Sequence, residues 1–195
     1  AERWQAFVYA SKSFRLARRF PEAEQCALRA IQENPTWADP YYEISAAYAE
    51  MAVASKDVGQ QQHNAHRSIQ WYEEGQKHPP IDDPRLLKNP LDYDYNPAAV
   101  VQVCYQLVGQ LETAKNLLDK AIAIGADPRL VEVRDQYEKI LSRRDAITAG
   151  LNLAGYLYTH GEPLKARDAL KALPVGSDIE TDSVGKARAA VLRDL

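Results

Sequence analysis

Four stretches of the sequence repeat one spacing of small and apolar residues, stepping by three, four and seven positions from a leading alanine. They are Ala23, Cys26, Ala27, Ala30 and Ile31; Ala65, Ser68, Ile69 and Tyr72; Ala114, Leu117, Leu118, Ala121 and Ile122; and Ala166, Ala169, Leu170 and Leu173. This spacing places each stripe on one face of an α-helix. Four such faces behind similar turns predict an all-α array of antiparallel helical hairpins, in which each hairpin buries its apolar face against the next.

Proline, glycine and aspartate mark where these helices begin and end. Proline fits the first turn of a helix, and glycine often follows the last turn. On this basis the sequence predicts helices over residues 2–18, 21–33, 39 to at least 51, 61–76, 98–108, 111–124, one or two over 129–160, 164–173, and a short amphipathic segment over 184–195. We therefore expect one domain over residues 1–195, with two hairpins in 1–76, further hairpins in 98–173 and a C-terminal segment in 174–195.

The segment of residues 77–97 interrupts the array. Its five prolines exclude a regular helix, but it carries more aliphatic and aromatic residues than a solvated linker would. These are Ile81, Leu86, Leu87, Leu91, Tyr93 and Tyr95. The sequence therefore predicts an ordered connection that packs against the flanking hairpins.

Composition restricts the classes of partner. The chain has 195 residues, of which 46% are hydrophobic, and its net charge of −3 comes from interspersed acidic and basic residues. A nucleic-acid-binding protein is expected to carry a basic stripe, and a membrane span needs about 18 consecutive apolar residues. We expect neither nucleic acid nor membrane as a partner. Cys26 and Cys104 lie on apolar helical faces, which favours core thiols and a cytoplasmic location. Without an N-terminal signal segment or methionine, the sequence is interpreted as a piece of a longer polypeptide.

The repeated residues resemble the tetratricopeptide repeat, the TPR. One repeat is formed by Phe7, Ala10, Phe14, Phe20, Ala23, Ala30 and Pro35; a second by Tyr41, Ile44, Tyr48, Ala65 and Ile69 with an enlarged turn; a third by Tyr105, Gly109, Leu111, Ala114, Leu118 and Ala121; and a fourth by Leu153, Ala154, Leu157, Gly161, Ala166 and Leu170. The leading alanines are 42, 49 and 52 residues apart, whereas the family period is about 34. The resemblance implies a TPR-like α-solenoid with an irregular period.

A second resemblance concerns the setting of these repeats. The run from Trp37 to Ile44 is followed by a proline-rich connection that ends in Tyr93-Asp94-Tyr95-Asn96-Pro97 and then by a further repeat. This arrangement, over about the first two thirds of the chain, is similar to helical-repeat regions downstream of family-two glycosyltransferase domains of bacteria and phages. In that family, sugar transfer belongs to a separate α/β domain. No glycine-punctuated, strand-rich segment of this sequence matches such a domain. The resemblance implies an accessory repeat region that positions an acceptor or a catalytic domain.

Candidate chemical motifs have a structural alternative in each case. Asp92-Tyr93-Asp94 has the form of a metal-binding Asp-x-Asp, but it precedes a helix start instead of ending a strand. His63 and His66 share a helix face without a third ligand, which favours ordinary surface histidines. We therefore expect no metal, no cofactor and no catalytic residue in this chain, and the chain is predicted not to be an enzyme.

A local basic patch combines Lys12 with Arg15, Arg18 and Arg19. Guanidinium groups can bind a carboxylate or a phosphate through paired hydrogen bonds. The alternative is a solvated helix end, where basic residues interact favourably with the helix dipole. The tryptophans Trp4, Trp37 and Trp71 could stack on sugars, but packing between hairpins is the simpler interpretation.

Family geometry implies that the first helix of each hairpin lines a concave surface, on which a protein, a peptide or an adjacent domain of the same polypeptide binds. Ten residues are predicted to face this surface: Val8, Lys12, Arg15, Leu16, Tyr42, Ala46, Glu50, Ala99, Val103 and Gln106. The predicted function is non-catalytic protein binding or scaffolding. The surface lacks the asparagine-plus-lysine arrangement with which chaperone-binding members of the family hold a terminal carboxylate.

Overall fold

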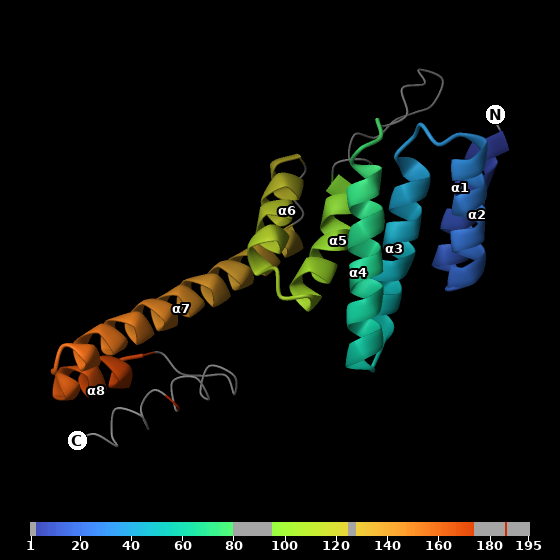
Figure 1. Cartoon of the computed structure of the whole chain (residues 1–195). Helices are drawn as coiled ribbons and strands as arrows, with labels where there is room; N and C mark the ends of the chain where they lie inside the picture. Colours follow the sequence, from blue (N-terminus) through green and yellow to red (C-terminus); the bar gives the residue numbers. More distant parts are fainter. Residues whose placement is uncertain (1–2, 80–94, 125–127, 174–185, 187–195) are drawn as a thin grey trace. The chain divides into compact units, whose positions relative to one another are not determined.

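The computed structural model describes residues 3–79, 95–124, 128–173 and 186, and this part of the chain is built of helices and turns without strands. The helices are α1 (Arg3–Leu16), α2 (Phe20–Glu33), α3 (Asp39–Ala54), α4 (Val58–Gly75), α5 (Tyr95–Leu107), α6 (Leu111–Ile124), α7 (Pro128–Thr159) and α8 (Pro163–Lys171) (Figure 1). They belong to two compact units, residues 1–135 and residues 136–195.

In the first unit, consecutive helices pair as hairpins. The pairs α1–α2, α3–α4 and α5–α6 pack most extensively, and α2 and α4 each contact the first helix of the next hairpin. Helix α3 also contacts both α1 and α5, so the first helices of the three hairpins lie side by side (Figure 1). The predicted all-α array of antiparallel hairpins is therefore confirmed.

The alanine-led stripes of α2, α4 and α6 supply much of the buried core of the first unit. Ala23, Ala27 and Ala30 of α2 are fully buried, and so are Ala114, Leu118 and Ala121 of α6. In α4 all four stripe residues are buried. Small side chains allow the two backbones of a hairpin to approach closely. In the first hairpin, the hydroxyl of Ser11 on α1 reaches the backbone of α2 and donates a hydrogen bond to the carbonyl of Ala23 at 2.8 Å.

Hydroxyl groups also join the second hairpin at its centre. Ser45 Oγ donates to the carbonyl of Ser68 at 2.9 Å, and Ser68 Oγ donates to the carbonyl of Ser45 at 2.8 Å. Both serines are buried, so these reciprocal bonds satisfy polar groups that would otherwise destabilise the core. Near the C-terminal end of α4, the ring of Tyr42 packs so closely over Gly75 that a Cβ at this position would lie 2.6 Å from it. Glycine is the residue that this contact admits.

Three of the hairpin turns share one backbone geometry. After α1, the N–H of Arg18 donates to the carbonyl of Arg15, and the N–H of Arg19 donates to that of Phe14. The same two bonds recur around Gly109 after α5 and around Gly161 after α7. This pair of bonds is the Schellman motif, which places one residue in the left-handed region. The φ angles of Arg18, Gly109 and Gly161 are 58°, 81° and 78°.

Helix boundaries agree with the sequence patterns where proline marks the start. Helices α2 and α8 carry proline in their first turn, as α3 does. Helix α4 begins three residues before the predicted Gln61, because Asp57 caps it by accepting a hydrogen bond from the N–H of Gln60 at 2.7 Å. The sequence left open whether residues 129–160 form one helix or two, and the structure has a single helix there, α7, which ends at Thr159.

The predicted connection lies mainly outside the described residues, since residues 80–94 are not described. Its first residues are anchored to α3: the carbonyl of Pro79 accepts a hydrogen bond from the N–H of Ala38 at 3.2 Å, and the ring of His78 stacks on Tyr41 at 4.4 Å. The packing of the rest stays a prediction. The Asp92-Tyr93-Asp94 motif and, apart from residue 186, the amphipathic segment 184–195 also lie outside the described residues.

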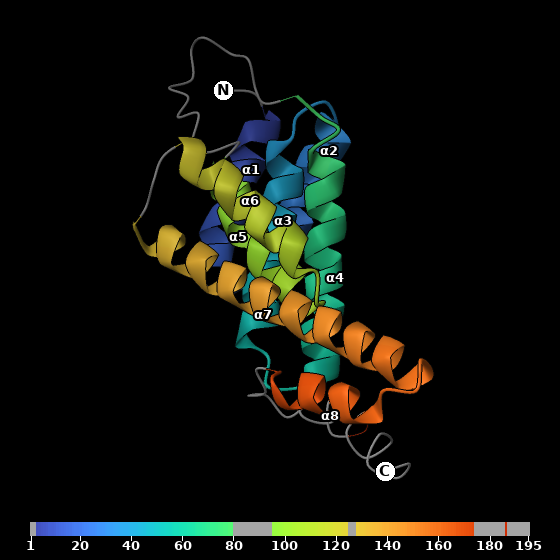
Figure 2. The same cartoon turned by 90° about the vertical axis from the view of Figure 1, so that its left-hand side faces the viewer.

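The second unit contains the predicted fourth hairpin. Ala154 of α7 and Ala166 and Leu170 of α8 form its buried cluster, with α8 folded back beside the C-terminal part of α7 (Figure 2). Leu153, which the repeat pattern assigns to this hairpin, is instead about half exposed, because it lies one position away from the buried face that Ala154 occupies.

Candidate functional site

A pocket of about 470 Å³ opens on the layer formed by the first helices of the three hairpins. Its lining consists of Arg18 from the α1–α2 turn, Phe20 at the start of α2, Ala49, Glu50, Val53 and Ala54 of α3, and Val100 and Val103 of α5. Apolar side chains dominate this lining. Val53 is more than half exposed, so the pocket presents apolar surface that a partner can bury.

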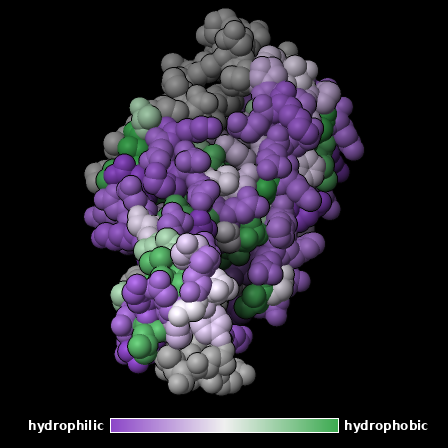
Figure 3. Space-filling view, turned by 60° about the vertical axis from the view of Figure 1, so that its left-hand side comes forward, coloured by the Kyte–Doolittle hydropathy of each residue, from purple (hydrophilic) through white to green (hydrophobic). Residues whose placement is uncertain are grey.

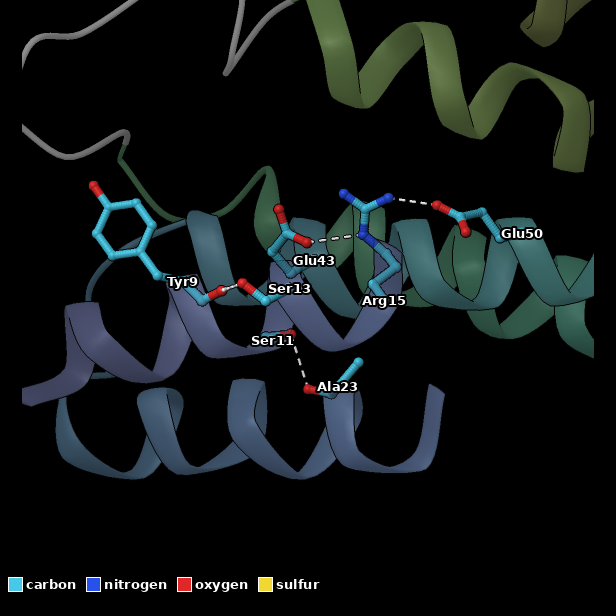
Figure 4. A network of polar contacts seen from close by, with 7 residues as sticks. All are labelled: Tyr9, Ser11, Ser13, Arg15, Ala23, Glu43 and Glu50. Carbon is cyan, nitrogen blue, oxygen red and sulfur yellow. Dashed lines mark hydrogen bonds and ion pairs between the residues drawn. The ribbon is translucent and has the colours of Figure 1, made fainter. Parts of the chain in front are cut away.

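One edge of the pocket is held by an ion-pair network between α1 and α3 (Figure 4). The guanidinium of Arg15 donates through Nε to Glu43 at 2.9 Å and through Nη1 to Glu50. Burial opposes the charge on Arg15, but the attraction of Glu43 and Glu50 outweighs it, so the pKa of Arg15 is raised above its ordinary value. Arg15 therefore fixes the position of Glu50 at the pocket.

The basic patch predicted from Lys12, Arg15, Arg18 and Arg19 divides into two kinds of residue. The charge of Arg15 is neutralised by its ion pair with Glu43 of α3. Arg19 donates to Glu22 at 2.8 Å, and its guanidinium lies over the Phe14 ring at 4.7 Å. Neither has the free charge that a four-residue anion site requires. Lys12 and Arg18 are exposed, and their side chains form no ion pair or hydrogen bond with any residue that the structure describes. Only their backbone groups are engaged.

The ten residues of the predicted binding surface reach different places. Glu50 and Val103 line the pocket, while Lys12 and Leu16 lie exposed on α1. Val8 instead packs on the buried pair Trp4 and Ala30. The remaining members are Arg15 in the ion-pair network, Ala46 and Ala99 as half-buried residues, and Gln106 as an exposed one.

Tyr42 belongs to a contact with α4. Its ring lies 5.9 Å from that of Tyr72, and its hydroxyl accepts a hydrogen bond from Gln76 at 2.6 Å. The structure therefore engages this residue in joining α3 to α4. A binding role for it stays a prediction, as it does for the other nine.

Several pocket residues were missed by sequence reasoning. Ala49 and Val53 are four positions apart on α3, and Val100 lies three positions before the predicted Val103 on α5, so each pair occupies one helix face. This spacing could have identified these residues from the sequence as neighbours on one helix face. The unusual backbone position of Arg18 could also have been recognised from the sequence, because an alignment of the hairpin turns places Arg18 with Gly109 and Gly161.

Other candidate residues occupy structural positions. Trp4 stacks on Trp37 at 6.4 Å, and Trp71 lies 6.1 Å from the ring of Tyr41. Cys104 is buried, and this burial raises the pKa of its thiol. Cys26 is half-buried.

His63 and His66 are exposed. Among the residues that the structure describes, no group of three or more potential metal ligands comes together.

The surface is mixed in polarity. On the face drawn in Figure 3, hydrophobic residues form separate spots within a largely hydrophilic surface. Within the described ranges, none of the helices combines the length and apolar character that crossing a membrane requires.

Comparison with solved structures finds a TPR protein. The chain is similar to a thermophilic TPR protein from Thermus thermophilus, with a TM-score of 0.50 and 14% sequence identity over 98% of this chain and 82% of that chain. No family model matches the sequence, and no curated protein matches it. The likeness shows the fold, which is an all-α TPR-like helical-repeat array.

Proposed function

We propose that this chain is a non-catalytic protein-interaction module that binds an extended peptide segment on the α1–α3–α5 layer. The pocket between the α1–α2 turn, α3 and α5 carries this proposal, because its apolar lining is open to solvent in the free chain. Helical-repeat arrays offer such layers as extended binding surfaces. A pocket of this size accommodates one or two apolar side chains of a partner.

The test is a selection of peptides from a random library displayed on phage, with the intact chain as the immobilised target. Selected peptides are then synthesised, and their dissociation constants are measured by fluorescence anisotropy. Replacement of Val53 by glutamate places a charge at the apolar mouth, so Val53→Glu is expected to weaken binding at least tenfold. Val103→Glu is expected to act in the same direction.

Val58→Glu is the matched control. Val58 is as exposed as Val53 but lies at the start of α4, away from the pocket lining. It should leave the dissociation constant unchanged, and circular dichroism should show the same helix content for all three variants. Failure to select any peptide, or equal affinities for Val53→Glu and Val58→Glu, would contradict the proposal.

The alternative role, as an accessory region of a glycosyltransferase polypeptide, rests only on the sequence resemblance of about the first two thirds of the chain. The similar Thermus thermophilus structure is that of a TPR protein, so it adds no support for a link to a transferase. The same experiment addresses this role, because a neighbouring domain that occupies this layer would compete with the selected peptides.

A further inference from the structure

Arg18 occupies a backbone position that favours glycine. Its φ of 58° lies in the left-handed region, where the Cβ of an L-residue crowds the following carbonyl oxygen and destabilises the backbone. The equivalent turns after α5 and α7 have Gly109 and Gly161 in the same hydrogen-bonding motif. The first hairpin thus accepts a strained residue where two others avoid the strain.

The side chain of Arg18 has no structural contact that would explain this cost. It is exposed and forms no ion pair, hydrogen bond or ring contact with the residues that the structure describes. Its neighbours differ: Arg15 is paired with Glu43 and Glu50, and Arg19 with Glu22. Strain that persists without a stabilising contact is typical of residues that serve a site.

Arg18 also lines the apolar pocket, together with Phe20, Val53 and Val103. An unpaired guanidinium beside an apolar pocket complements a ligand that has a carboxylate next to an apolar side chain, because the guanidinium can donate two parallel hydrogen bonds to the carboxylate. Glu50, the acidic residue of the lining, is held by Arg15 and does not neutralise Arg18.

From the proposed peptide-binding function, we infer that Arg18 determines specificity by recognising an aspartate or glutamate side chain of the partner, placed beside the apolar residue that enters the pocket. Arg18 therefore selects acidic-apolar segments from other apolar ones. Its left-handed backbone directs the side chain to the pocket at a cost in stability.

The test extends the peptide selection to three variants of the intact chain. Peptides selected on the wild type are expected to be enriched in aspartate and glutamate, and peptides selected on Arg18→Gly are expected to lose this enrichment. Arg18→Lys should keep part of the enrichment, because lysine retains the charge but lacks the planar guanidinium that donates two parallel hydrogen bonds. Arg19→Gln is the control, since Arg19 is adjacent and exposed but already paired, and it should select the wild-type pattern.

A double-mutant cycle gives the decisive measurement. Changing the acidic residue of the strongest peptide to its amide should weaken binding to the wild type at least fivefold and leave binding to Arg18→Gly unchanged. In the same preparations, Arg18→Gly should raise the denaturation midpoint of the free chain, because it relieves the backbone strain.

The two proposals fail in different ways. One outcome is that Val53-dependent peptides are found, but changing their acidic residue to its amide weakens binding equally to the wild type and to Arg18→Gly. This would overturn the role of Arg18 and leave the peptide-binding function standing. An absence of Val53-dependent peptides would overturn both. An unchanged or lower midpoint for Arg18→Gly would overturn the strain argument on which the inference rests.

Discussion

At the residue scale, alanine is the side chain on which the hairpins depend most. Ala23 is fully buried, and its carbonyl receives the hydroxyl of Ser11. A larger side chain at this position has to push α1 and α2 apart. This closeness, more than the apolar character of the stripe, sets the geometry of the first hairpin.

We expect Ala23→Leu to destabilise the first unit by about 1–3 kcal/mol, because overpacking a close helix contact forces backbone shifts. Urea denaturation followed by tryptophan fluorescence measures this, since Trp4, Trp37 and Trp71 all lie in residues 1–135. Ala6→Leu, at an exposed position of α1, is the control. Equal midpoints for the two variants would show that the proposed close approach is wrong.

At the element scale, α1 and α3 are joined by a cation held between two carboxylates. The side chains of Arg15 and Glu43 are only 14% and 16% exposed, so their charges are mostly removed from water. A buried ion pair contributes little net stability, but removing one partner leaves an unpaired charge. The pair is therefore best understood as fixing how α1 lies on α3.

Arg15→Met should cost about 3 kcal/mol, because Glu43 then stays buried without its partner. The double variant Arg15→Met/Glu43→Leu should recover most of this loss, since it removes both charges. Urea midpoints of the two variants make the comparison. A double variant no more stable than the single one would contradict the assignment of the cost to the stranded carboxylate.

Helices α4 and α5 are joined by Tyr105, whose hydroxyl donates to Glu73 at 3.0 Å. Burial, and then the bond to Glu73, raise the pKa of Tyr105 well above its ordinary value of 10. The protonated phenol is thus favoured by folding, so its contribution to stability is complete below pH 10 and is lost as the pH rises above this value.

Tyr105→Phe should therefore lower the free energy of unfolding by about 1 kcal/mol at pH 8, where the wild type has the hydrogen bond. The difference between the two proteins should narrow at pH 11, because only the wild type loses the contribution of Tyr105. Tyr9→Phe, at an exposed position of α1, should show no difference at either pH. A constant difference for Tyr105→Phe would contradict the raised pKa.

The helices were predictable from the sequence because proline and glycine act locally. The proline at the start of α2 and the glycine after α5 fix boundaries without help from the rest of the fold. The pocket was not predictable in the same way. Arg15 and Glu50 are 35 residues apart, and their pairing depends on how α1 packs against α3. Predicted surface residues such as Tyr42 were therefore assigned without knowledge of which neighbour each would meet.

At the scale of the whole molecule, residues 80–94 join parts of the chain that already touch. Helix α5 packs on both α3 and α4, and Tyr105 bonds to Glu73 across this contact. The connection therefore does not have to hold the two sides together. Its anchored start at Pro79 agrees with the prediction that it packs against the hairpins, which stays untested for residues 80–94.

We expect a chain cleaved within residues 80–94 to remain one particle, because the contacts of α5 with α3 and α4 are independent of the cut. Limited proteolysis followed by size-exclusion chromatography tests this, with urea-treated nicked protein as the control in which the fragments separate. Fragments that separate without denaturant would show that the segment is a tether between independent parts.

The pairing of each helix with its neighbour in the chain has a kinetic consequence. Within residues 1–135, the main contacts join segments close in sequence, and proteins with such low contact order fold quickly. The hairpin of α1 and α2 spans residues 3–33, so it is complete after a short stretch of synthesis. The completed hairpin is then available as a template on which α3 can pack while the later helices are still being translated.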